Sequence, residues 1–123
     1  MEVIEGAPGD RQYVESYGPG RFTISGILHT GSVLVFPDRT EPWSVTDFTA
    51  LAVDDLSRIM ADAEIEFMLL GCGARIQFPP RALRDAARAA GKSIEPMDTG
   101  AACRTFNVLT LEERRVAAAL IAL

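Results

Sequence analysis

Apolar residues in the first third of the chain come in short runs separated by glycine and proline. This pattern is typical of strands joined by turns, and it predicts strands over residues 12–17, 22–28 and 32–36 with turns at 18–20 and 29–31. We expect the three strands to form an antiparallel meander. A further short strand is predicted over residues 41–45, around Trp43.

Helical spacing replaces this pattern in the second half of the chain. Apolar residues at i, i+3, i+4 and i+7 predict a helix over residues 55–63. A second helix, over residues 81–90, follows Pro80 and ends before Gly91, the residues favoured at those two positions. Thr110 and Glu113 form a capping box, which predicts a last helix with an apolar face made of Val116, Ala117, Leu120 and Ile121.

The segment 66–70 is continuously apolar, which indicates a central strand covered on both faces. With the helix 81–90 and a short strand over 93–95 it makes a β-α-β unit, whose strands run parallel and end at one rim of the sheet. The sequence therefore predicts an α/β fold with three layers, β/β/α, and a mixed sheet. It combines the N-terminal meander, the β-α-β unit and the C-terminal helix.

Composition narrows the class of protein. The chain has 123 residues, 48% of them hydrophobic, which suits one α/β domain over residues 12–123 behind a flexible leader at 1–11. Its formal net charge of −5 opposes binding to nucleic acid, and its longest apolar run is too short to span a bilayer. The N-terminus lacks a signal pattern, so we expect a soluble protein in the cytoplasm.

Two short motifs were tested against known chemistry. Gly71-Cys72-Gly73 follows the central strand, as a dinucleotide fingerprint does, but Ile76 stands at the third glycine position. Asp98-Thr99-Gly100 matches the aspartic protease motif, but helical patterns frame it. We expect a tight turn at the first motif and a helix cap at Asp98 or Thr99 in the second.

No catalytic constellation is legible in the remaining residues. Cys72, Cys103 and His29 lack a spacing that would join a thiol to a base or hold zinc, so we predict no catalytic residue, no metal and no cofactor. Arg104 lies in an apolar segment, where it pairs with Asp98, bonds to carbonyls at a strand end, or recognises a ligand or partner. Trp43 is either at the edge of the core or an interface anchor.

Several segments together resemble one family. They are residues 97–109 (MDTGAACRTFNVL), 112–118 (EERRVAA), 69–73 (LLGCG), 78–80 (FPP), 24–26 (ISG) and 32–35 (SVLV). They are similar to the small domain family that includes mitochondrial respiratory complex I assembly factor three, and the resemblance covers most of residues 12–123. It implies a three-layer fold built around a mixed sheet.

The resemblance also implies a function. It favours a non-catalytic, protein-binding role in assembling a membrane-associated complex, with complex I subunits or assembly factors as partners and the inner membrane reached through a partner. The alternative is a small-molecule binder or enzyme that uses the rim. Under both hypotheses one set of candidate binding residues follows: Gly71, Cys72, Gly73, Asp98, Thr99, Arg104 and Asn107.

Overall fold

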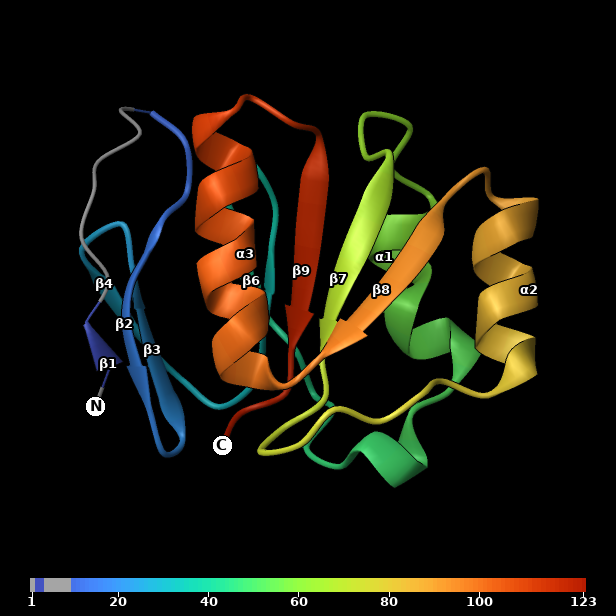
Figure 1. Ribbon diagram of the computed structural model, residues 1–123, viewed down its shortest axis with the longest axis horizontal. Helices are drawn as coiled ribbons and strands as arrows, with labels where there is room; N and C mark the ends of the chain where they lie inside the picture. The colour runs from blue at the N-terminus through green and yellow to red at the C-terminus, as the bar shows by residue number, and fades with distance from the viewer. Residues whose placement is uncertain (1, 4–9) are drawn as a thin grey trace.

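Two β-sheets form the framework of the chain, and Figure 1 shows them side by side with the long helix α3 in front. The computed structural model describes residues 2–3 and 10–123. The first sheet is antiparallel throughout, and its four strands follow chain order: β1 (Glu2–Val3), β2 (Val14–Gly18), β3 (Arg21–Ile24) and β4 (Ile27–Thr30). The predicted meander is therefore present.

The prediction of a single strand over residues 22–28 is wrong, because a two-residue turn divides this segment into β3 and β4. Ser25 and Gly26 both have positive φ, 47° and 82°, as a tight hairpin turn requires. His29 consequently lies in β4, paired with Phe22, and not in a turn. Of the predicted leader, residues 1 and 4–9 lie outside the described residues, while Glu2–Val3 pairs with β2.

The second sheet is mixed and has the strand order β6-β5-β9-β7-β8. Its strands are β5 (Val33–Val35), β6 (Thr40–Pro42), β7 (Phe67–Gly71), β8 (Ser93–Met97) and β9 (Val116–Leu120). β7 runs parallel to both neighbours, β8 and β9, as the β-α-β prediction requires. Two predictions need correction: β5 belongs to this sheet and not to the meander, and β6 ends before Trp43.

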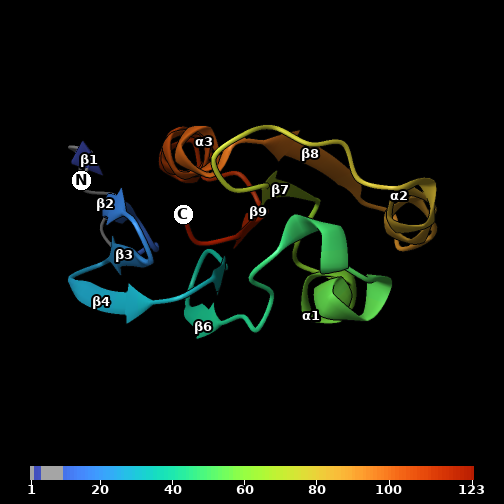
Figure 2. The same ribbon diagram turned by 90° about the horizontal axis from the view of Figure 1, so that it is seen from below.

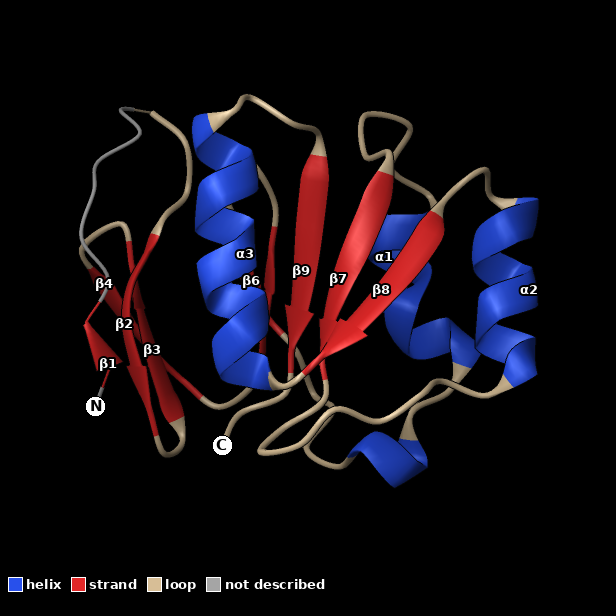
Figure 3. Cartoon of the chain, viewed as in Figure 1, coloured by secondary structure: helices blue, strands red, loops and turns tan. Residues whose placement is uncertain are grey.

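Helices cover both faces of the second sheet (Figures 2 and 3). They are α1 (Ser57–Met60), α2 (Arg81–Ala89) and α3 (Thr99–Leu111), with 3-10 turns η1 (Phe48–Ala50) and η2 (Val53–Leu56) before α1. α2 confirms the predicted helix 81–90. The helix predicted over 55–63 is divided between η2 and α1.

The C-terminal helix exists but lies earlier than predicted, over Thr99–Leu111. Glu113 adopts a left-handed φ of 60°, and the Arg114 amide bonds to the Leu109 carbonyl, which closes the helix there. Val116–Leu120, predicted as helical, is the strand β9, buried at every position. Alanine favours helix, but burial between β5 and β7 outweighs that preference.

Two hydrophobic cores lie on opposite faces of the second sheet. One joins the first sheet and α3 through Phe22, Ile24 and Phe106, and the other joins α1 and α2 through Ile59 and Leu83. The side chains of β9 point alternately into the two cores. Its small alanines let the neighbouring elements pack closely on both faces of the strand. Within the described residues no helix has the length and apolar character needed to cross a membrane.

Candidate functional site

The predicted rim exists as a tightly bonded junction between β7 and the start of α3. The Thr99 amide donates to the Gly73 carbonyl, and the Gly73 amide donates to the Thr99 hydroxyl, both at 2.9 Å. The same hydroxyl donates to the Ile121 carbonyl at 2.7 Å. The β-α-β reasoning thus brought residues 71–73 next to 98–99, but the polar groups of Gly73 and Thr99 bond to each other.

The start of α3 is capped from within the chain. Asp98 is the N-cap, and its carboxylate accepts from the Ala101 amide at 2.9 Å, as predicted. Gly100 packs against β2 so closely that an added Cβ would lie 2.7 Å from the Tyr17 hydroxyl. A side chain of the first sheet therefore fills the space beside this helix end.

Arg104 is the exposed part of the rim. It lies one turn into α3, and its guanidinium donates to the Tyr17 hydroxyl. The sequence left open a salt bridge with Asp98, and the hydrogen bond to Tyr17 is a different contact. Because the side chain is exposed, it is the rim residue best placed to meet another molecule.

Asn107 lies away from the other rim residues. It follows Thr99 by two helical turns, or about 12 Å along the axis, and is only 2% exposed. Its side-chain amide bonds both backbone groups of Val14, accepting from the amide at 2.9 Å and donating to the carbonyl at 2.8 Å. From inside the core, Asn107 thus satisfies both backbone groups of Val14 at the start of β2.

Trp43 is a buried residue, 8% exposed, and its indole N–H donates to the Asp55 carbonyl at 2.8 Å. This places it in the core beside η2, the first of the two alternatives. Little of the ring is open to a partner.

The thiols and the imidazole lie in separate places. Cys72 and Cys103 are free and buried in the two different cores. Burial raises the pKa of both thiols, that of Cys103 to about 12, so neither forms a thiolate at neutral pH. His29 lies in the first sheet, where partial burial lowers its pKa.

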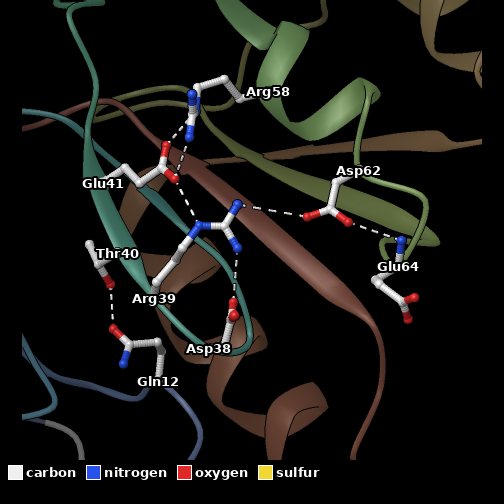
Figure 4. Close-up of polar contacts among 8 residues, drawn as sticks. All are labelled: Gln12, Asp38, Arg39, Thr40, Glu41, Arg58, Asp62 and Glu64. Atoms are coloured by element: carbon white, nitrogen blue, oxygen red, sulfur yellow. Dashed lines mark hydrogen bonds and ion pairs between the residues drawn. The ribbon is translucent and has the colours of Figure 1, made fainter.

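Sequence reasoning missed an ion-pair cluster that joins β6 to α1 (Figure 4). Glu41 accepts from Arg39 and from Arg58, both at 2.8 Å, and Arg39 also approaches Asp62 at 3.8 Å. The bond with Arg58 is the main reason that the pKa of Glu41 is lowered. A concavity of about 460 Å³ opens beside Arg39 and Arg58.

The cluster was not predictable because its central bond, between Glu41 and Arg58, joins single charges that lie seventeen residues apart in the sequence. Both guanidinium groups are already paired with carboxylates, so little net positive charge is left for a ligand. Within residues 10–123 no three His, Cys, Asp or Glu side chains are placed to hold a metal ion. The cluster acts as a structural tie.

Comparison with known proteins places this chain among relatives with and without an assigned role. An uncharacterized protein of Rhodobacter capsulatus is 38% identical over 109 residues, covering 88% of this chain and 82% of that protein. The zebrafish (Danio rerio) protein named NADH dehydrogenase [ubiquinone] 1 alpha subcomplex assembly factor 3 is 35% identical over 88% of this chain. The chain spans 63% of the zebrafish protein.

The fold is also shared with a solved structure. A Bartonella henselae protein described as an outer membrane protein superposes with a TM-score of 0.85 at 36% identity, over 94% of this chain and 97% of that one. The model of one family, described as a protein of unknown function, matches residues 14–121. The chain therefore belongs to the DUF498/DUF598 family.

Proposed function

We propose that this chain is a non-catalytic protein-binding factor that aids the assembly of a membrane-associated complex, with respiratory complex I as the target. The observation that carries the proposal is the similarity over most of the chain to a relative named as an assembly factor of NADH dehydrogenase. Because this chain covers only part of that relative, its partners belong to the proposal as well.

The geometry of the rim supports binding of a protein over catalysis or binding of a small molecule. The Gly73 amide and the Thr99 hydroxyl, which could hold a phosphate or carboxylate, are already bonded within the chain. The two cysteines are buried with raised pKa values, and His29 is on another sheet. What the rim offers to solvent is a fixed surface around Arg104.

We assign partner recognition to this surface. Arg104 is exposed, and the Tyr17 hydroxyl helps to hold its guanidinium in one orientation. A positioned planar guanidinium recognises carboxylates and carbonyls with two parallel hydrogen bonds. The factor works from the cytoplasm, and a partner held at this surface links it to the complex of the inner membrane.

The test is an affinity purification from the native organism with wild-type and Arg104→Ala chains. We expect the wild type to recover complex I subunits or assembly factors, and the variant to lose them while its thermal midpoint stays within a few degrees. Arg104→Lys, which keeps the charge but not the planar fork, should recover less than the wild type.

Deletion of the gene provides an independent measurement. Native gels of the deletion strain should show less assembled complex I, and the wild-type chain should restore it. Normal complex I in the deletion strain, together with recovery of the bait alone, would overturn the proposal.

A further inference from the structure

The chain has a negative net charge, but one of its segments is strongly basic. Residues 74–92 hold five cations, Arg75, Arg81, Arg84, Arg88 and Lys92, and a single carboxylate, Asp85. The segment comprises the loop after β7 and helix α2. In Figure 1 the helix lies at the end of the molecule opposite the first sheet, and the loop runs to it from the middle of the lower edge. The remaining acidic residues lie on other elements.

Helix α2 carries two cations at a spacing that destabilises a helix slightly. Arg84 and Arg88 lie four residues apart on α2, so their like charges lie on one side and repel, and Lys92 follows beyond the end of the helix. With Ser93 and Ile94 they line a concavity of about 350 Å³. Among the described residues no carboxylate forms an ion pair with Arg84 or Lys92.

Asp85 compensates the segment only weakly. It lies 3.5 Å from Arg81 and 3.9 Å from Arg88, and those arginine side chains are 91% and 83% exposed. Ion pairs between such exposed groups contribute little to stability. The cations therefore remain available to an anionic surface.

The same segment exposes two large apolar side chains. Phe78 is 69% exposed and Ile76 is 51% exposed, both in the loop that leads into α2. The Arg84 guanidinium donates to the Pro79 carbonyl at 3.3 Å, which ties this loop to the helix. A loop with an exposed aromatic ring, joined to a helix that carries several arginines, is the composition that suits the boundary between lipid headgroups and acyl chains.

We propose that residues 75–92 bind directly to the surface of a bilayer that contains anionic phospholipid. The cations meet the headgroup phosphates, and Phe78 and Ile76 enter the boundary below them. Asp54 and Asp55 lie on η2, which contacts α2, but the five cations outnumber these two carboxylates and Asp85. Carboxylates more than about 8 Å away are largely screened at physiological ionic strength. Phe78 and Ile76 favour a bilayer over nucleic acid, which offers no apolar layer for them to enter.

The test is co-sedimentation of the purified full chain with vesicles. We compare vesicles of phosphatidylcholine alone with vesicles that also contain phosphatidylglycerol, at low and at physiological salt. We expect binding to the anionic vesicles only, weakened by salt. The double variant Arg84→Gln, Arg88→Gln should bind about 25-fold more weakly, about fivefold for each arginine. Phe78→Ser should lower binding about tenfold.

Matched controls separate this surface from general charge and general apolarity. Arg114→Gln with Arg115→Gln makes the same change in net charge on another part of the chain, and Val108→Ser removes an apolar side chain that is 56% exposed. Both controls should bind as the wild type does, and all variants should keep its thermal midpoint.

Three results would overturn the proposal. They are no binding to anionic vesicles at low salt, equal binding to neutral vesicles, and equal losses in the two arginine pairs. Binding to poly-L-glutamate without binding to vesicles would also overturn it and would identify an acidic polypeptide as the occupant. Because no partner protein is present, the result is independent of the proposed assembly role.

Discussion

Two regions of this chain are rich in polar contacts, but they differ in burial. Around α3, Thr99 is fully buried and Asn107 nearly so, and each makes two hydrogen bonds to backbone groups. In the cluster around Glu41, the Arg58 side chain is 65% exposed. A buried polar group that loses its partner cannot turn to water, whereas an exposed one can. Stability should therefore depend on the α3 contacts far more than on the cluster.

The largest effect is expected for Asn107→Leu. The substitution leaves the buried amide and carbonyl of Val14 without their partner, at about 1 to 3 kcal/mol for each group. Urea unfolding should show a loss of several kcal/mol. Val108→Ala, on the exposed face of the same helix, should change stability by no more than about 0.5 kcal/mol. Similar midpoints for both variants would contradict the role given to Asn107.

Thr99→Val should follow, because it keeps the shape of the side chain and removes the hydroxyl. The Gly73 amide and the Ile121 carbonyl then lose a partner in a buried site. We expect a loss of about 1 to 3 kcal/mol in urea unfolding. Thr99→Ser keeps the hydroxyl and should cost less than the valine variant, so the reverse order would show that packing of the methyl group is what matters.

Gly100→Ala tests the close approach of α3 to β2. The new methyl group would lie 2.7 Å from the Tyr17 hydroxyl and 3.1 Å from two ring carbons. We expect a net loss of about 1 kcal/mol, because the crowding exceeds the gain in helix propensity. In a Tyr17→Phe background the nearest atom is absent and the loss should shrink. An equal loss in both backgrounds, measured by a double-mutant cycle, would refute the contact.

The smallest effect is expected for Glu41→Gln, in the exposed cluster. Arg58 and Arg39 hold the pKa of Glu41 below its ordinary value of 4.5, so the folded chain binds this proton more weakly than the unfolded chain. The stabilisation is therefore present above that value and is lost as pH falls through the folded pKa. The variant should be slightly less stable than the wild type at pH 7 and equal to it in strong acid. A constant difference across this range would contradict the ion-pair account.

Much of the rim could be predicted from the sequence. A continuous apolar run, a capped helix and a second short strand indicate a β-α-β unit, and the geometry of that unit brings residues 71–73 next to 98–99. Residue type predicted a helix cap at Asp98 or Thr99, and Asp98 is the cap. These signals are local, and here the tertiary contacts agree with them.

The other features depend on contacts between distant segments. Val116–Leu120 has the composition of a helix, and only the gap between β5 and β7 makes it a strand. One asparagine carries no pattern that would pair it with Val14, ninety-three positions away. The bond between Glu41 and Arg58 likewise joins single charges, seventeen positions apart, that no spacing rule connects.

The position of β9 bears on how the chain reaches its fold. Ala119 of β9 pairs with Leu34 of β5 on one side and with Leu70 of β7 on the other. The middle of the sheet therefore forms only when segments far apart in the sequence come together. Until β9 docks, β5 and β7 each present an open edge to any other strand. Closure of long loops is slow, so the folding chain should expose these edges for some time. During that time, chains at high concentration can associate through the exposed edges. Refolding yield should therefore fall as protein concentration rises.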